Sequence, residues 1–310
     1  MGALTRRAAF DAVEGVPAGL LSEGPVWDPL ASLVRWVDIR GRRLHTLDLS
    51  SGTVGTRELD EQVGFALPDG AGGLLLGLRS GLAHLVDDAL TPLLPATWDP
   101  RTHRANDGKT DRTGRLWMGT LEDAETRPTA AFLRLEPGPR PAAGPADDGQ
   151  AQPGPWLRTV IGGVVVANGP AFDQAGATVY WADSPTGTIW AAPLDPGSGL
   201  PGSPRVHTRD DDCFPDGMTV DGDDCLWSAK WGGGRIVRST PEGAVDRVLT
   251  LPVSRVSSVA FVGPRRDVLA VTTAADPEGR EELAGRVLLL DVGVSGPEES
   301  AVDLTALVGA

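Results

Sequence analysis

The sequence predicts an all-β fold made of many short antiparallel strands. Its 310 residues include 40 glycines and 26 prolines, which favour frequent turns over long helices. Six short apolar runs with the composition of β-strands repeat along the chain. They begin at Leu33, Leu74, Leu116, Val179, Leu226 and Val268, so the intervals between them are 41, 42, 63, 47 and 42 residues. This period is typical of propeller blades, and it predicts a six-bladed β-propeller with four-stranded antiparallel blades.

Each repeating unit has the same order of elements. A turn containing Asp, Gly or Pro precedes each apolar run, and another short apolar segment precedes the turn, as in Gly24–Trp27 before the run at Leu33. A further strand follows, as in Arg43–Asp48. Such a succession of hairpins indicates an up-and-down antiparallel sheet, and closing six sheets into a ring removes most exposed strand edges.

The longest interval contains a segment of different composition. Glu136–Trp156 is rich in Pro, Gly, Ala and Asp, and strand-like segments resume on both sides of it. We therefore interpret residues 136–156 as a surface insertion and residues 1–310 as a single propeller domain.

The charge of the chain argues against some partners. Lys and Arg total 28 and Asp and Glu total 42, which gives a net charge of −14. This charge disfavours binding to nucleic acid or to an anionic membrane, attracts cations, and commonly serves solubility alone. No run approaches the ~20 apolar residues of a membrane span, and Met1–Gly15 has no continuous apolar core of a signal peptide. We expect a cytoplasmic protein, a monomer or weak dimer, in which Cys213 and Cys225 are buried thiols.

Four polar residues occupy corresponding places in different units. Glu23, Asn106, Asn168 and Asp216 each lie five residues before an aspartate that opens the next turn. The innermost strands of a propeller start at one mouth of the central channel, so these side chains are expected to converge there. Two carboxylates and two amide oxygens would form an oxygen-rich cation site. The alternative is that each side chain only caps its own turn.

Other kinds of site find less support in the sequence. The four histidines, at positions 45, 84, 103 and 207, have neither i,i+4 spacing nor repeat-equivalent placement, which disfavours an imidazole-bound zinc. A Gly-x-Ser-x-Gly motif is absent, which disfavours a serine hydrolase. Gly232-Gly233-Gly234 lacks the Lys-Ser/Thr pair of a phosphate-binding loop and indicates a close hairpin instead.

At these residues the chain resembles the senescence marker protein 30/gluconolactonase family, also called regucalcin-like. The motifs that carry the resemblance extend from about residue 20 to residue 291. They are Glu23-Gly24-Pro25-Val26-Trp27, Arg104 with Asn106-Asp107-Gly108-Lys109, Gly114–Thr120, Asn168-Gly169, Pro215–Asp221, Trp231–Arg235 and Val271–Ala274.

The resemblance implies a six-bladed propeller that binds one divalent cation and hydrolyses a sugar lactone. Glu23, Asn168 and Asp216 match the family's metal ligands, and Asp216 also matches its general base. Arg104 and Asn106 match residues that contact the lactone or lie close to the metal. Because all the ligands are oxygens, calcium is the leading candidate, with Mn²⁺, Mg²⁺, Fe²⁺ and Zn²⁺ as alternatives.

One position departs from the family pattern. Where some members have a glutamate that holds substrate hydroxyls, this chain has Ala124, which leaves Glu122, Asp123 and Glu125 as candidates for that role. The implied reaction is metal-dependent opening of a glucono-, xylono-, arabinono- or similar 1,4- or 1,5-lactone to the aldonic acid. The alternatives are a phosphotriesterase-like or other ester hydrolase and a non-catalytic calcium-binding protein, because one fold supports several functions.

Overall fold

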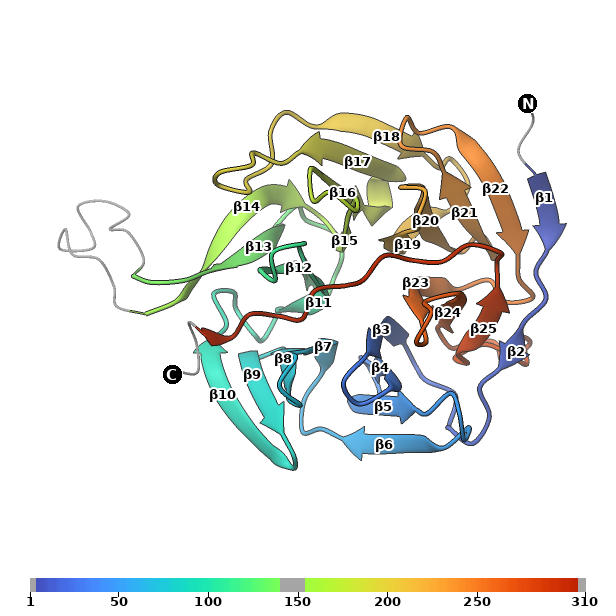
Figure 1. The fold of residues 1–310 in the computed structure, drawn as a ribbon, viewed down its shortest axis with the longest axis horizontal. Coiled ribbons are helices and arrows are strands. Elements are labelled where there is room, and N and C mark those ends of the chain that lie inside the picture. Colours follow the sequence, from blue (N-terminus) through green and yellow to red (C-terminus); the bar gives the residue numbers. More distant parts are fainter. Residues whose placement is uncertain (1–3, 140–153, 306–310) are drawn as a thin grey trace.

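The structure, a computed structural model, describes residues 4–139 and 154–305, which form six β-sheets arranged as blades around a central channel (Figure 1). The prediction of a six-bladed antiparallel propeller is confirmed. Within the described ranges, the named helical element is the short 3₁₀ helix η2 (Ser184–Thr186). No helix of this part of the chain is long and apolar enough to cross a membrane.

The strands of each blade follow the chain from the channel outward. Blade 1 contains β3 (Ser22–Asp28), β4 (Leu33–Asp38), β5 (Arg43–Leu47) and β6 (Val54–Glu58); blade 2 contains β7 (Val63–Pro68), β8 (Leu74–Leu78), β9 (Gly81–Val86) and β10 (Ala89–Pro95); blade 3 contains β11 (His103–Thr110), β12 (Leu116–Glu122), β13 (Ala130–Glu136) and β14 (Trp156–Val164). Blade 4 contains β15 (Ala167–Phe172), β16 (Thr178–Asp183), β17 (Thr188–Pro193) and β18 (Arg205–Arg209); blade 5 contains β19 (Phe214–Val220), β20 (Leu226–Trp231), β21 (Arg235–Ser239) and β22 (Val245–Thr250); blade 6 contains β23 (Val256–Val262), β24 (Val268–Thr273) and β25 (Leu288–Asp291).

The six apolar runs of the sequence are the second strands of the blades, namely β4, β8, β12, β16, β20 and β24. Each of these strands lies between two others and has a neighbouring blade on both faces, which is why it is apolar throughout. One cluster of buried apolar side chains fills each interface between neighbouring blades. Trp117 meets Phe172 across blades 3 and 4, and Trp227 meets Phe261 across blades 5 and 6, both edge to face.

The start of the chain closes the ring. β2 (Asp11–Ala12) is the outermost strand of blade 6 and pairs antiparallel with β25, so this blade combines both ends of the chain. β1 (Leu4–Arg7) pairs parallel with β22 as a fifth strand of blade 5. The repeat pattern did not predict these two strands, because each is too short to carry a period of its own.

The predicted insertion joins two adjacent strands of blade 3. Its end residues, Glu136 and Trp156, are directly paired across β13 and β14. The interior of the insertion, residues 140–153, lies outside the described residues.

Cys213 and Cys225 are both buried and free, as expected. They lie at opposite ends of the β19–β20 hairpin, because Phe214 pairs with Trp231 at one end and Val220 with Leu226 at the other. Burial raises the pKa of both thiols to about 11.

The segment after β25 crosses one mouth of the channel (Figure 1). Its backbone is fixed to several blades: the Val302 amide donates to the Pro68 carbonyl at 2.9 Å, and the Gly222 amide donates to the Ser295 carbonyl at 2.7 Å. An ion pair of 2.9 Å joins Arg112 to Glu299. These contacts cover the mouth at which the inner strands end and leave the mouth at which they begin.

The turns beneath this segment depend on buried aspartates. Asp221 is fully buried, and its Oδ2 accepts from Trp227 Nε1 and Arg238 Nε, both at 2.7 Å. Its Oδ1 accepts from the backbone amides of Asp223 and Cys225 in the turn. One carboxylate thus joins the turn, the second strand and the third strand of blade 5.

We predict that Asp221→Ala lowers the free energy of unfolding by about 2–4 kcal/mol, because the buried Nε1 of Trp227 and Nε of Arg238 both lose their acceptor, although Arg238 keeps its ion pairs with Asp223 and Asp246. Asp291→Ala is the matched control: Asp291 is exposed and accepts only the Gly293 amide, so the loss should stay below about 1 kcal/mol. Urea denaturation of both variants measures the difference. Equal losses in the two variants would contradict the assigned role of Asp221.

Candidate active site

A cavity of about 350 Å³ lies at the mouth where the inner strands begin. All five residues singled out in the sequence line it: Glu23, Arg104, Asn106, Asn168 and Asp216. Their side chains are at most 8% exposed. The structure therefore brings together, from blades 1, 3, 4 and 5, residues as much as 193 positions apart in the sequence (216 − 23).

A break in strand pairing occurs at the corresponding place in each of these inner strands. Pairing shifts between Glu23 and Val26 in β3, and the same irregularity recurs in β11, β15 and β19 at Asn106, Asn168 and Asp216. A bulge interrupts the alternation of side chains and redirects one of them. The recurrent break accounts for four polar side chains on four strands facing one cavity.

The two remaining inner strands have the same break but carry no ligand there. In β7 the position is Gly64, where an added Cβ would lie 2.6 Å from the carbonyl oxygen of Ala105 in the next blade. In β23, Ser257 donates its hydroxyl to the Ser22 carbonyl at 2.6 Å. Blades 2 and 6 therefore contribute close packing and not side chains for chemistry.

Two aspartates hold the segments that lead into the site. The Oδ1 and Oδ2 atoms of Asp38, at the end of β4, accept from the amides of Leu21 and Leu20 at 2.9 and 3.0 Å. Asp183, at the end of β16, accepts from the Val166 amide in the same way. Each carboxylate fixes the backbone just before a site residue, Glu23 in one blade and Asn168 in the other.

A chain of hydrogen bonds orients the amides of the site. Arg104 Nη1 donates to Asn106 Oδ1 at 2.8 Å, and Asn106 Nδ2 donates to Asn168 Oδ1 at 2.6 Å. Asn168 Nδ2 donates to Ser184 Oγ at 2.8 Å, and that hydroxyl donates to the Pro215 carbonyl at 2.6 Å. Because an amide oxygen has two lone pairs, Asn168 Oδ1 keeps one for another partner.

Glu23 and Asp216 are two carboxyl groups in a desolvated place. Burial raises the pKa of Glu23 well above its ordinary value, and the negative charges of Asp216 and Asp107 raise it further. The pKa of Asp216 is also raised well above its ordinary value, by burial and then by Asp107. Burial raises the pKa of Asp107 itself to about 6. A positive charge among these groups would reverse the effect.

Arg104 supplies one such charge. Burial lowers its pKa to about 10, and the nearby carboxylates of Glu125, Asp123 and Glu23 oppose that shift. The guanidinium therefore stays protonated at neutral pH. Its charge lowers the pKa values of both Glu23 and Asp216, but less than burial raises them.

The donors in the cavity fit a divalent cation. Asp216 Oδ1 is a buried acceptor with no hydrogen-bond partner among the described residues. Glu23 and Asn168 add oxygens that face the same cavity. In the described part of the chain, no group of three or more His, Cys, Asp and Glu side chains could hold a metal, so the fit depends on Asn168 as the third oxygen donor.

The cavity also contains residues that the sequence reading missed. Its wall is apolar at Leu21, Leu121, Val166, Phe214 and Trp231, and its charged lining includes Arg40, beside the already named candidate Glu125. Leu121, Phe214 and Trp231 lie at or near strand ends, where apolar residues are expected for packing alone, and Arg40 lies in a cluster with Arg42 and Arg43 that is typical of a solvated turn.

The structure indicates which of the three acidic residues next to Ala124 is available to a substrate. Glu122 pairs with Arg127, and Asp123 pairs with Arg79 at 2.8 Å, so both carboxylates are engaged. Glu125 has positive φ (51°), lines the cavity, and makes no side-chain hydrogen bond or ion pair with the described residues. Of the three candidates, Glu125 is the one available to a ligand.

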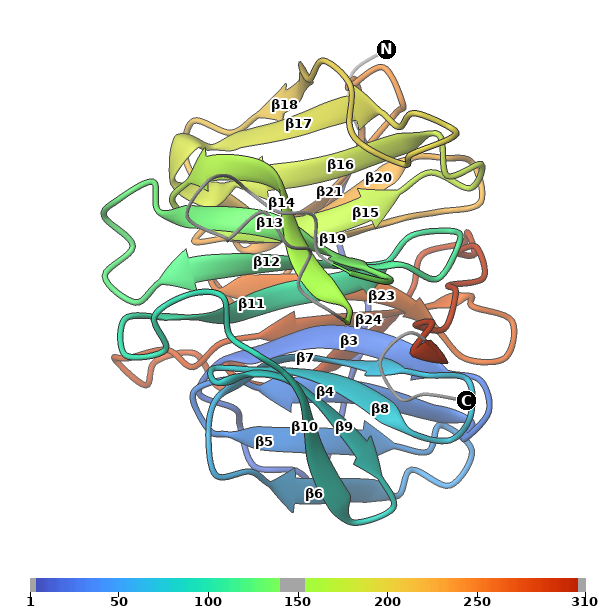
Figure 2. The same ribbon diagram turned by 90° about the vertical axis from the view of Figure 1, so that its left-hand side faces the viewer.

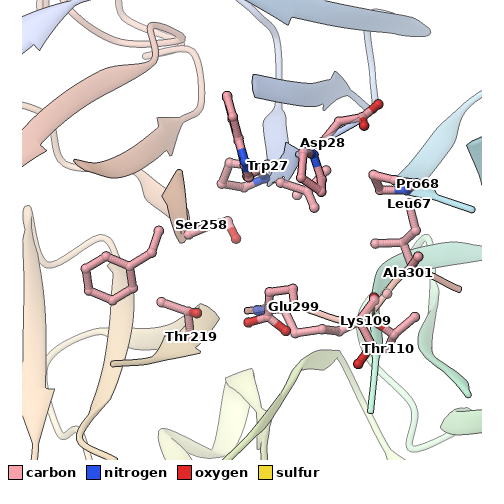
Figure 3. A pocket seen from close by; sticks show the side chains of 18 of the residues that line it. Trp27, Asp28, Leu67, Pro68, Lys109, Thr110, Thr219, Ser258, Glu299 and Ala301 are labelled. Carbon is pink, nitrogen blue, oxygen red and sulfur yellow. Dashed lines mark hydrogen bonds between the residues drawn. The ribbon is translucent and has the colours of Figure 1, made fainter. Parts of the chain in front are cut away.

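A second, smaller cavity of about 70 Å³ lies between the site and the C-terminal segment (Figure 3). Trp27, Lys109, Thr219 and Ser258 surround it, and Glu299 covers it. The Lys109 ammonium donates to the Met218 carbonyl at 3.0 Å. The C-terminal segment lines this smaller cavity, whereas Glu23 and Asp216 line the larger one.

Comparison with known protein families identifies the family to which these site residues belong. The model of the SMP-30/gluconolactonase/LRE-like region matches residues 21–275. The chain belongs to this family. The match begins just before Glu23 and extends past β24, so it includes all five site residues.

Several relatives resemble the chain over nearly its full length. A 6-deoxy-6-sulfogluconolactonase of Pseudomonas putida is 34% identical over 292 residues, covering 90% of this chain and 94% of that protein. A pentonolactonase of Haloferax volcanii is 30% identical over 295 residues, covering 92% and 95%. The solved structure of regucalcin, a calcium-binding protein of Agrobacterium tumefaciens, has a TM-score of 0.86 at 24% identity and covers 97% of this chain and 100% of that one, which supports the fold.

We predict that, with divalent cations removed by a chelator, the contribution of Glu23 and Asp216 to the free energy of unfolding falls as pH rises above about 4 and through their raised pKa values. The sign follows because the folded state binds these protons more tightly than the unfolded state. Glu23→Gln removes one of the two titrations and should flatten this dependence. Urea denaturation at about pH 5 and pH 8 measures it. An identical pH dependence in the two proteins would contradict the assignment.

Proposed function

We propose that this protein is a divalent-metal-dependent hydrolase that opens a sugar lactone, such as a glucono-, xylono- or arabinono-lactone, to the aldonic acid. The observation that carries the proposal is the meeting of Glu23, Asn168 and Asp216 in one cavity, with a buried Asp216 oxygen that lacks a partner among the described residues. The relatives add support, since proteins similar over nearly the whole chain are named as lactonases of several sugars.

Glu23, Asn168 and Asp216 would hold the cation. Their oxygens suit calcium best, and the number of protein ligands leaves room for water or substrate. When bound, a divalent cation polarises the lactone carbonyl and stabilises the oxyanion that develops on it. The negative charges of Glu23 and Asp216 would then be compensated, which removes the mutual destabilisation of the two carboxylates.

Asp216 is the proposed general base. Asp216 lines the cavity, and its Oδ1 has no hydrogen-bond partner among the described residues, so it could accept a proton from a water molecule within direct hydrogen-bond reach. The proton would pass from the attacking water to this carboxylate and then to the ring oxygen that leaves as a hydroxyl. Burial, which raises the Asp216 pKa, partly offsets the lowering by the cation and keeps the group basic.

Arg104 and Asn106 would position the substrate. Arg104 presents a protonated guanidinium in the cavity wall and can donate to ring or hydroxyl oxygens. Asn106 holds Arg104 at its Oδ1 and Asn168 at its Nδ2, so it links the substrate contact to the metal ligand. At the rim, Glu125 is suited to accept hydrogen bonds from sugar hydroxyls.

We predict that Ca²⁺ stabilises the wild-type protein against unfolding, by about 2.7 kcal/mol when its concentration is 100 times the dissociation constant. Glu23→Gln should reduce both the metal content and this stabilisation, because it removes one of the two anionic ligands. Elemental analysis and calorimetric titration measure the two quantities. Unchanged stoichiometry and affinity would rule Glu23 out as a ligand.

We predict that the wild type releases acid from some of a panel of pentono- and hexonolactones, above their spontaneous opening, and that a chelator abolishes the activity. Asp216→Asn keeps a ligand oxygen but removes the base, so turnover at saturating metal should fall by roughly 10²- to 10⁴-fold. Weakly buffered indicator assays measure both effects. Normal metal-saturated turnover of Asp216→Asn would disprove the base assignment.

We predict that Arg104→Ala raises KM more than it lowers kcat, if Arg104 contacts the substrate and the transition state alike. Full saturation curves on the best lactone of the panel separate the two constants. Activity of the pure wild type on none of these lactones would favour the phosphotriesterase-like, other ester-hydrolase or calcium-binding alternatives.

A further inference from the structure

We propose that Arg40 is a specificity determinant that binds an anionic substituent, a phosphate, sulfonate or carboxylate, on the part of the lactone farthest from its carbonyl. The inference rests on the proposed lactonase function and narrows its substrate class to acidic sugar lactones.

The first observation is that Arg40 is unpaired while its neighbours are engaged. Among the described residues, Arg40 makes no hydrogen bond or ion pair, although it lines the cavity. Arg42 Nη1 donates to the Asp60 carbonyl at 3.3 Å, and Arg43 Nε donates to Glu58 Oε1 at 2.8 Å. Of these three neighbouring arginines, two in the turn after β4 and one at the start of β5, Arg40 alone has no side-chain partner among the described residues.

The second observation is the depth of each group. Glu23 and Asp216, which would hold the cation and hence the lactone carbonyl, are 8% and 6% exposed, and Arg104 is 6% exposed. Arg40 is exposed and lines the same cavity. A ligand whose carbonyl reaches the buried carboxylates therefore has its opposite end toward the level of Arg40.

The third observation is the charge of the lining. Its charged residues are Glu23, Asp216 and Glu125, with Arg40 and Arg104 opposite in sign, and the carboxyl of Asp107 acts on Glu23 and Asp216 from nearby. A bound divalent cation and Arg104 would together balance the charges of Glu23, Asp216 and Asp107. At the exposed rim, Arg40 is then the cationic lining residue that can pair with an anionic substituent.

The two arginines line the same cavity. Burial lowers the pKa of Arg104, and the charge of Arg40 is a further, smaller cause of that lowering. An anion bound beside both would reduce this unfavourable interaction. Guanidinium groups suit such ligands because their fixed donors match two oxygens of a phosphate, sulfonate or carboxylate. Glu125, the other charged residue of the rim, would keep the anion on the Arg40 side.

The test compares three δ-lactones, those of gluconate, 6-phosphogluconate and 6-deoxy-6-sulfogluconate, on the metal-loaded wild type and on Arg40→Ala. We expect kcat/KM for at least one of the anionic lactones to exceed that for glucono-δ-lactone. Arg40→Ala should lower this value by roughly 10-fold, as for the loss of one charge-assisted hydrogen bond, and change the neutral lactone less than about twofold. The relative rates of the phosphate and sulfonate substrates identify which anion is preferred.

Arg43→Ala is the matched control, because it removes the same charge from the neighbouring strand without touching the cavity. It should leave the preference for the anionic lactone intact. Arg40→Lys keeps the charge but loses the paired donors, so it should recover only part of the preference. Added salt should reduce the preference of the wild type, since the contact lies at an exposed rim.

A binding measurement separates this inference from the proposed function. Calorimetric titration of the metal-loaded proteins with gluconate and 6-phosphogluconate needs no turnover. Tighter binding of 6-phosphogluconate that is lost in Arg40→Ala supports the anion site even if no lactone is hydrolysed. If the wild type neither prefers an anionic lactone nor binds 6-phosphogluconate more tightly than gluconate, the role of Arg40 is refuted, while hydrolysis of glucono-δ-lactone leaves the lactonase proposal standing.

Discussion

Two carboxyl groups buried together, those of Glu23 and Asp216, are the central constraint on this structure. Burial raises the pKa of each, and the nearby carboxyl of Asp107 raises both further. A protein that served only to be stable would replace such groups with apolar side chains, since buried charge is costly. Their presence in one cavity is the observation on which the proposed cation site depends.

The rest of the propeller supports that arrangement at several levels. Apolar clusters between the blades fix the ring, and the pairing breaks of the inner strands turn one polar side chain per ligand-bearing blade toward the channel. Asp38 and Asp183 hold the backbone that enters two of these strands. The C-terminal segment covers the opposite mouth, so the site is approached from one side (Figure 2 shows the blades from the side). Rigid elements thus position the groups, as precise chemistry requires.

The net charge of the whole chain and the two arginines of the cavity have opposite effects on a charged ligand. The chain carries a net charge of −14, yet the cavity places Arg104 at its base and Arg40 at its rim. The overall field favours a cation in solution, whereas the two arginines favour electron-rich groups within the cavity. An anionic lactone must therefore overcome the overall repulsion through local contacts, which makes its recognition dependent on few residues and on ionic strength.

The sequence by itself predicted the fold class, the number of blades and five residues that the structure brings together in one cavity. The period of the apolar runs follows from the burial of the second strand in each blade, and the polar residues recur at one position relative to the turns, so both features can be detected in the local sequence. Tertiary structure decided what depends on distant segments: the closure of blade 6 by β2, the separation of Cys213 from Cys225, and the presence of Arg40 and Glu125 in the cavity. Arg40 and Arg42 are alike in sequence, and only the packing of blade 1 against its neighbours leaves one of them facing the site. A side chain's partner is set by which surfaces the folded chain brings together, and no local pattern encodes that.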